Sequence, residues 1–223
     1  MKDGLFKTEL HSHTIDASPC STLTAEKLVE LYVEKNYDSV VITNHFTHRY
    51  MNLYEIPTYR EYVEFYIEAY EKLKRIAGDK LTVIFGVELR FDDVDNDYLW
   101  IGANADYLRK NDDILNLGTK GFREVCAKNG WLFIQAHPFR PTMKVVDPTM
   151  VDGVEVYNAK NESFRNFVAE KWADHFGLIK TSGTDIHKPH ETPSGGILTS
   201  KKMETMQDVL EIIKSGNYKL VTE

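Results

Sequence analysis

Short apolar segments alternate with amphipathic segments along the whole chain, and no other feature constrains the fold as strongly. The segments that are short and rich in β-branched or aromatic residues are predicted strands: 5–10, 38–43, 81–87, 98–102, 131–136, 153–157, 178–182, 197–199 and 218–221. The segments with apolar residues at helical spacing are predicted helices: 25–33, 59–77, 122–128, 163–176 and 203–214. Strands that alternate with helices indicate βαβ units and a mostly parallel sheet.

The number of strands favours a closed sheet. About seven of them are strong candidates, which fits a barrel better than an open sheet. The chain has 223 residues, and no low-complexity segment or obvious linker divides it. We therefore expect an α/β fold that forms a single domain over residues 1–223.

Composition limits the partners and the cellular location. The net charge of −7 argues against a broad nucleic-acid-binding surface, although bound cations can still attract a small anion. Cys20 and Cys126 do not make a disulfide framework, no apolar run approaches about 18 residues, and the first residues lack a signal peptide. We expect a soluble cytoplasmic protein without a nucleic-acid polymer or membrane as partner. The oligomeric state stays open.

Residues that commonly bind metals stand where predicted strands end. They are His11, His13, His45, Glu88, His137, Asp185 and His187. A single histidine at a strand end is usually a hydrogen-bonded loop residue. In a parallel barrel, however, the carboxyl ends of all strands open on one face, so this set would meet there. Imidazole nitrogens and carboxylate oxygens together suit zinc, iron or manganese, so the sequence predicts a metal site.

The sequence around these residues resembles the PHP family, named for polymerase and histidinol phosphatase domains. The matching motifs, in order, are His11-Ser12-His13-Thr14, Val41-Ile42-Thr43-Asn44-His45, Gly86-Val87-Glu88, Ala136-His137-Pro138 and Gly183-Thr184-Asp185-Ile186-His187. The resemblance implies a distorted (β/α)7 TIM-like barrel with a di- or trinuclear metal site at the carboxyl ends of the strands. It spans nearly the whole chain and implies a free-standing domain.

The resemblance also assigns ligands to two of the ions. His11, His13, Glu88 and Asp185 would hold one ion, and Glu88 would bridge to a second. His137 would bind that second ion. Glu88, His137 and Asp185 would thereby form the catalytic centre.

A third ion would be held by His45 and His187 in the same scheme. The chain departs from the family at Asn44, where members usually have Asp in the sequence Thr-Asp-His. Two or three divalent ions, zinc, manganese or iron, are therefore expected.

Two further positions are open. Many family members have His or Asp shortly after the first motif, where this chain offers Asp16, or Ser18 as a neutral alternative. Many also have His on the strand after Glu88, where Asp97 is a possible substitute. We place Asp16 among the expected metal ligands.

Phosphate esters also attract guanidinium groups, whose paired N–H donors match phosphate oxygens. Arg140 follows His137 by three residues and is the best-placed candidate, ahead of Arg90; each could instead form a surface ion pair. Asn158 could support a ligand or simply form a turn. Cys20 is more simply read as a small buried hydrophobe than as a catalytic thiol.

The function expected from this site is hydrolysis of a small phosphomonoester by metal-activated hydroxide. Histidinol phosphate, a nucleotide, a phosphotyrosine peptide and a sugar phosphate would all satisfy the same ions. One alternative is a metal-dependent amidohydrolase-type enzyme, although no lysine has a clear ligand position. Another is a metal-binding regulatory domain without catalysis.

Overall fold

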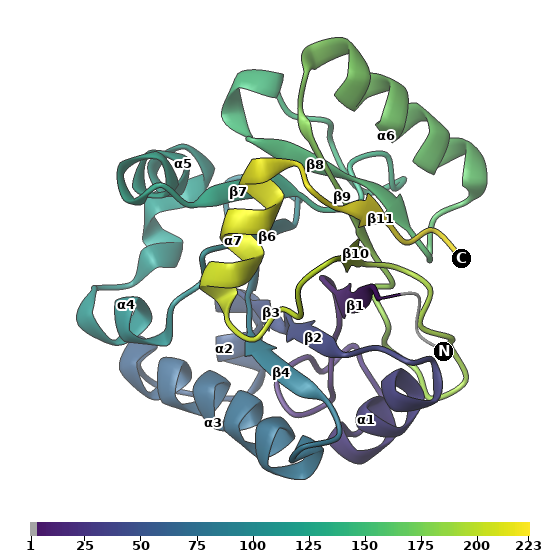
Figure 1. The fold of residues 1–223 in the computed structure, drawn as a ribbon. Coiled ribbons are helices and arrows are strands. Elements are labelled where there is room, and N and C mark those ends of the chain that lie inside the picture. Colours follow the sequence, from purple (N-terminus) through teal and green to yellow (C-terminus); the bar gives the residue numbers. More distant parts are fainter. Residues whose placement is uncertain (1–3) are drawn as a thin grey trace.

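The computed structural model describes residues 4–223, in which strands and helices alternate (Figure 1). The strands are β1 (Phe6–Glu9), β2 (Ser39–Ile42), β3 (His45–Phe46), β4 (Thr82–Phe85), β5 (Glu88–Leu89), β6 (Tyr98–Ile101), β7 (Leu132–Gln135), β8 (Gly153–Asn158), β9 (Ile179–Gly183), β10 (Ile197–Thr199) and β11 (Lys219–Leu220). The helices are α1 (Ala25–Glu34), α2 (His48–Leu53), α3 (Tyr59–Ala77), α4 (Ala105–Lys110), α5 (Gly118–Asn129), α6 (Ser163–Phe176) and α7 (Met206–Ser215), with 3-10 turns η1 (Ile114–Leu117) and η2 (Pro148–Met150).

The strands form two mixed sheets. In the first, the order is β11-β10-β1-β2-β4, and β1, β2 and β4 run parallel while β10 is antiparallel to both of its neighbours. In the second, the order is β3-β5-β6-β7-β8-β9, and β6 is antiparallel to β5 and to β7. The α/β class is confirmed, and the sheets are mixed rather than parallel.

The expected closed barrel of seven parallel strands is not formed, because the sheets stay open and separate. The connection from β5 to β6, residues 90–97, explains part of the difference. A parallel return needs a crossover of about a dozen residues or more, usually a helix, so this short loop brings β6 back antiparallel.

Two strands of the first sheet continue into the second after a break. Residues 43–44 join β2 to β3, and residues 86–87 join β4 to β5. Across the breaks Gly86 N donates to Ile42 O at 3.0 Å, and Glu88 N donates to Asn44 O at 3.2 Å. A side chain at Gly86 would collide with Val41 and with the Ile42 carbonyl, so the backbones approach here only because residue 86 is glycine. Side chains near the breaks therefore lie where the two sheets meet.

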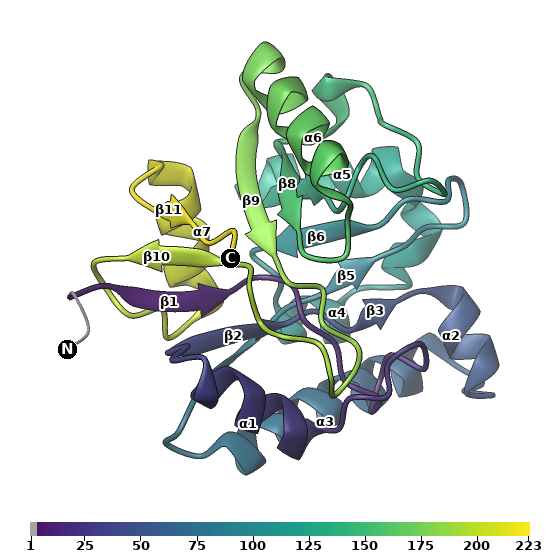
Figure 2. The same cartoon turned by 90° about the vertical axis from the view of Figure 1, so that its right-hand side faces the viewer.

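Helices cover the outer faces of both sheets (Figures 1 and 2). Helices α1 and α3 pack on each other, and their apolar residues share a buried cluster with β2 and β4. Helix α6 covers β8 and β9, while α5 packs on β7 and α7 on β6. Within the second sheet, Tyr98 stacks on Phe133 with ring centroids 4.3 Å apart. This packing leaves the ends of the strands free to carry polar side chains.

The predicted strands and helices are present, including the short strands β10 and β11, whereas the short helices α2 and α4 were not predicted. Helices α2 and α4 have six residues each, too few to show a helical apolar period in the sequence. Helix α5 begins at Gly118, four residues before the expected start. Among residues 4–223 we find no helix with the length and apolar character needed to cross a lipid bilayer.

Helix α2 is fixed by its first residue. His48 Nδ1 lies 2.7 Å from Asp92 Oδ2, and its Nε2 lies 2.7 Å from Asp113 Oδ2. Burial alone would lower the pKa of His48, but hydrogen bonds to Asp113 and Asp92 raise it above the usual value. The ion pairs therefore stabilise the fold fully below the unfolded-state pKa of about 6.5, and they are lost as pH rises through the folded-state pKa.

We predict that His48→Gln lowers the free energy of unfolding by about 0.5 kcal/mol at pH 6, since the pairs are partly solvated. The deficit should shrink as pH rises to about 9, because the histidine of the wild type loses its charge. Urea unfolding of chelator-treated protein at both pH values measures it. The exposed His175 on α6 gives the matched control His175→Gln. A deficit that does not change with pH would contradict the prediction.

Candidate metal centre

Seven side chains from both sheets converge where the sheets meet. We call them the histidine–carboxylate cluster: His11, His13, His45, Glu88, His137, Asp185 and His187. They follow or begin strands β1, β3, β5, β7 and β9, as the sequence predicts. All are buried except His45, which is partly exposed.

Glu88 lies at the centre of the cluster and is fully buried. Its Oε1 is 3.2 Å from His11 Nε2 and 3.3 Å from His137 Nε2. Its Oε2 is 3.3 Å from His13 Nε2 and 2.8 Å from His45 Nδ1. One carboxylate therefore touches four imidazole rings, which is the contact pattern of a bridging ligand.

Asp185 closes the other side of the first histidine pair. Its Oδ1 lies 3.6 Å from His11 Nε2 and 3.3 Å from His13 Nε2. Its Oδ2 accepts a 2.7 Å hydrogen bond from Arg140 Nη2, and the same nitrogen donates to Asn158 Oδ1 at 3.0 Å. Arg140 is thus in the site, but its contact is with a carboxylate of the cluster. Asn158 also serves the site, because its Nδ2 lies 3.3 Å from Asp185 Oδ2.

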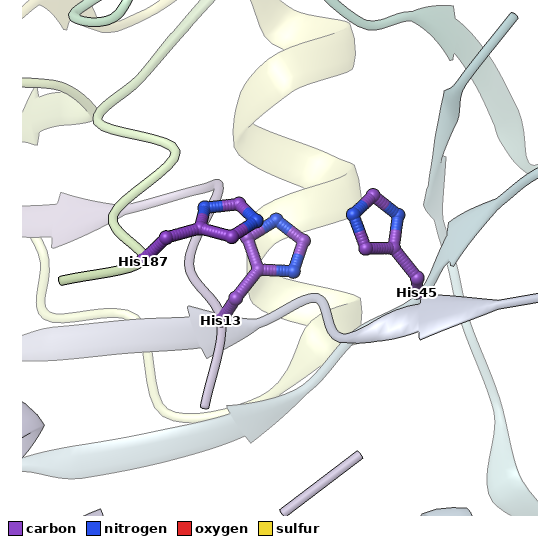
Figure 3. A group of neighbouring side chains, drawn as sticks. All are labelled: His13, His45 and His187. Atoms are coloured by element: carbon purple, nitrogen blue, oxygen red, sulfur yellow. The ribbon is translucent and has the colours of Figure 1, made fainter. Parts of the chain in front are cut away.

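Three rings form the other end of the cluster (Figure 3). The His13 ring centroid is 4.6 Å from that of His45 and 4.2 Å from that of His187. One nitrogen from each ring lies within 4.8 Å of the other two. These rings come from three different segments, and they could hold one cation together.

Charges within the cluster keep both carboxylates ionised. Burial would raise the pKa of Glu88, but His45 and His11 hold it well below its usual range. Burial likewise opposes ionisation of Asp185, and His11 is the first of the groups that hold its pKa well below the usual value. Ionised oxygens are what divalent cations require as ligands.

The surroundings of the cluster also lower the pKa values of His13 and of the nearby Cys20 thiol. Burial and the neighbouring His187 hold the pKa of His13 well below its usual range, so this ring is neutral at pH 7. Burial would raise the pKa of the Cys20 thiol, but hydrogen bonds with His187 and His45 lower it to about 5. Both effects leave donor atoms without protons.

A second layer of carboxylates positions the cluster and was not foreseen. Glu155, fully buried, accepts from His11 Nδ1 at 2.9 Å through Oε1 and from His137 N at 3.0 Å through Oε2. Glu9 accepts from the backbone N–H groups of His11 and Thr184, both at 3.0 Å. For Glu155 the available signal was a charged residue within an otherwise apolar part of a strand, which rarely occurs without a partner.

Unpartnered polar atoms test whether these residues fit a metal. His11 Nε2, His13 Nε2 and His137 Nδ1 are buried and make no hydrogen bond among the described residues. Buried nitrogen atoms that no hydrogen bond satisfies are costly, so three in one cluster, two of them close to carboxylate oxygens, fit a site for a cation. Four groups of three residues have ligand atoms within 4.8 Å of one another: His11-His13-Glu88, His11-His137-Asp185, His45-Glu88-Asp97 and His13-His45-His187. The donor set fits divalent metals.

The comparison with protein families agrees with the motifs and the cluster. The PHP domain matches residues 9–220, which is nearly the entire chain. The chain belongs to the PHP domain family. No curated protein matches it.

Several solved structures share the fold of this chain. One is a two-domain protein from Bacteroides vulgatus with a predicted PHP-like metal-dependent phosphoesterase, 16% identical, with TM-score 0.66. It is covered over 66% of its length and covers 99% of this chain. PsfC from Pseudomonas syringae is 14% identical, with 92% and 88% of the two chains covered and TM-score 0.66. An amidohydrolase from Chromobacterium violaceum with bound sulfate is 12% identical over 93% of this chain and 96% of its own, with TM-score 0.53.

The two candidates for the ligand position after the first motif, Asp16 and Ser18, lie in different places in this PHP domain. Asp16 is not brought into the cluster, because Lys72 Nζ binds its Oδ1 at 2.5 Å. Ser18 supports the cluster instead, since its Oγ contacts His13 Nδ1 at 3.2 Å and accepts from His45 N at 2.9 Å. The expectation that Asp16 is a ligand therefore has no geometric support.

The acidic residue after β5 has two partners. Asp97 lies 3.7 Å from His137 Nε2, which places it beside the cluster. Arg90 also pairs with both of its carboxylate oxygens at 2.6 Å, so Arg90 is not free for a phosphate group. Asn44, which replaces the usual family Asp, accepts from Thr14 N at 2.8 Å and thereby fixes the loop after His13.

We predict that Glu155→Gln weakens zinc or manganese binding by about 10- to 100-fold. The variant turns one acceptor oxygen into a donor, so it cannot accept from both His11 and the His137 backbone. Competition with a fluorescent chelator measures the affinity. Glu162→Gln, at an exposed position before α6, is the matched control and should bind as the wild type does. Equal affinities for both variants would contradict the role of Glu155.

Proposed function

We propose that this chain is a metal-dependent phosphoesterase that hydrolyses small phosphomonoesters. The observation that carries the proposal is that one carboxylate, Glu88, contacts both His11 and His13 and also His137. Because these ligands share the same carboxylate, two cations bound to them would be neighbours. Paired cations are a recurrent device for phosphoryl transfer.

By the family pattern, His11, His13, Glu88 and Asp185 would hold one ion, and Glu88 and His137 would hold a second. Glu88 Oε1 lies 3.2 Å from His11 Nε2 and 3.3 Å from His137 Nε2, which fits a carboxylate shared between the two. The bound ions would bind phosphate oxygens, offset their charge and lower the pKa of a coordinated water, with zinc, manganese or iron as candidates.

His45 and His187, with His13 beside them, would hold a third ion. The family pattern and the closeness of these three rings support this. A substrate at this centre would contact a network of polar side chains. In this network Arg140 donates to Asn158 and Asp185, and Asn158 donates to Glu155. Arg140 holds Asp185 in place and offers positive charge close to it.

A small cationic opening favours an anionic substrate. A cavity of about 40 Å³ beside the cluster is lined by His45, Thr47, Arg49, Tyr50 and Arg90. Arg49 is exposed and makes no ion pair among the described residues, so its guanidinium group is free for an incoming anion. The opening thus supports an anionic substrate. Amide hydrolysis is the second candidate, because one structural neighbour is described as an amidohydrolase.

The decisive experiment is phosphate release from a panel of phosphomonoesters with added manganese or zinc. We expect activity that disappears with a chelator and returns when metal is restored. Glu88→Gln should lower turnover by more than about 100-fold and also lower the bound metal, because the bridging charge is lost. Metal-loaded protein that hydrolyses amides but no phosphomonoester would overturn the proposal. A fully active Glu88→Gln variant would refute the proposed site.

We also predict that Arg49→Ala raises KM by roughly 5-fold and leaves kcat nearly unchanged. An exposed guanidinium group contributes at most about 1 kcal/mol to holding an anion, and it acts before the chemical step. Steady-state kinetics with the best substrate of the panel measure both constants. Arg60→Ala, also exposed, is the control. A fall in kcat with unchanged KM would contradict this role.

A further inference from the structure

The segment between β7 and η2 is irregular, and it carries Arg140 into the cluster. We call residues 138–147 the Arg140 loop. Most connections in compact domains have about four to six residues, so this one is long, and long loops are usually either functional or mobile. Arg140 Nη2 donates to Asp185 Oδ2 at 2.7 Å, and this contact is kept only if the loop is held in place.

Two buried amide side chains bind the backbone of the Arg140 loop, and we call this arrangement the amide clamp. Asn96 Oδ1 accepts from Lys144 N, and Asn96 Nδ2 donates to Lys144 O, both at 2.8 Å. Gln135 Nε2 donates to the same carbonyl at 2.7 Å, and Gln135 Oε1 accepts from Val146 N at 3.3 Å. Neither amide has any exposed surface. The clamp thus gives the loop the paired backbone bonds that a neighbouring strand would provide.

The clamp is built on the same two segments that carry part of the cluster. Asn96 directly precedes Asp97, and Gln135 lies two residues before His137. Asp97 Oδ2 is 3.7 Å from His137 Nε2. The two backbones are joined at this point, because Ala136 N donates to Asp97 O at 2.9 Å. Each segment therefore presents one side chain to the cluster and the other to the loop.

The start of the Arg140 loop has an anchor of its own. Arg165 Nη1 donates to Phe139 O at 2.7 Å. The Phe139 ring also packs edge-on against Trp172 of α6, with ring centroids 6.3 Å apart. Between this anchor and the clamp, Met143 N donates to Arg140 O at 2.9 Å and closes a turn. Arg140 is therefore held from both sides.

We propose that Asn96 and Gln135 are positioning residues of the metal centre. By clamping the backbone of Lys144, they keep Arg140 in contact with Asp185. A loop without the clamp would gain conformational freedom, so Arg140 would hold Asp185 for only part of the time. Binding of a divalent ion should then weaken, and turnover should fall with it. Only the effect on turnover rests on the proposed function.

Hydrogen exchange tests the clamp in the wild type, without any variant that could misfold. The amide protons of Lys144 and Val146 should exchange at least about 10-fold more slowly, after correction for intrinsic rates, than that of Thr142. The Thr142 N–H makes no hydrogen bond among the described residues and serves as the internal reference. Residue-resolved NMR of the metal-free protein measures the three rates. Equal protection at all three positions overturns the proposal.

Trypsin tests whether the clamp holds the loop. The bond after Lys144 is the trypsin site of the loop, because Pro141 blocks cleavage after Arg140. A protease must bind the backbone around the bond that it cuts, and the clamp occupies both backbone groups of Lys144. Asn96→Ala and the isosteric Asn96→Asp should be cut there at least about 10-fold faster than the wild type and the exposed control Asn129→Ala. Urea unfolding verifies that each variant is folded. Folded variants that are cut no faster overturn the proposal.

A double-mutant cycle tests whether the clamp acts through Arg140. Zinc or manganese affinity is measured by competition with a fluorescent chelator. Arg140→Ala and Asn96→Asp should each weaken binding by roughly 10-fold. The double variant should bind no more weakly than Arg140→Ala alone, because the clamp has nothing left to position. Losses that add would overturn the positioning role. A coupled loss of affinity in a protein that hydrolyses no phosphomonoester would refute the proposed reaction alone, whereas hydrolysis with additive losses would refute only the clamp.

Discussion

The structure depends on a buried carboxylate and the rings that compensate it. Glu88 has no exposed surface, and an isolated buried charge is strongly destabilising. Its two oxygens contact four imidazole rings, at distances from 2.8 to 3.3 Å. Those rings belong to segments separated by up to 126 residues, from His11 to His137. The ends of several strands must therefore meet in one place for Glu88 to be tolerated, and this requirement ties the fold to the site.

The two open sheets bring the ends of several strands together around Glu88. Strands β2 and β4 break at residues 43–44 and 86–87, and their continuations β3 and β5 join the second sheet. The breaks turn His45 and Glu88 toward His11 and His13, which follow β1. A bridge between Ser12 and Ile186 brings the segment after β9 to the same point. The cluster thus lies at the junction of the sheets, supported by both.

The residues of the cluster could be predicted from the sequence more fully than the topology of the sheets could. Ligand-type residues at strand ends are visible in local patterns, and all seven members of the cluster meet as expected. Whether a returning strand is parallel depends on loop length and pairing, so the antiparallel entry of β6 was missed. Glu155 was missed for another reason: it acts through contacts with residues far along the chain, and no motif marks such contacts. Asp16 shows the converse. Its spacing from the first motif made it a plausible ligand, but it forms an ion pair with Lys72, which lies far along the chain.

Backbone strain occurs at two members of the cluster. His137 has φ of 30° and Asp185 has φ of 56°, a region that costs non-glycine residues roughly 1–3 kcal/mol. Each is held by a specific bond: His137 N donates to Glu155 Oε2, and Asp185 N donates to His11 O at 2.9 Å. These bonds aim the two side chains inward at the expense of local stability. Donor atoms that are held by the protein's own hydrogen bonds lose little further freedom when they bind a cation, which is the general benefit of such preorganisation.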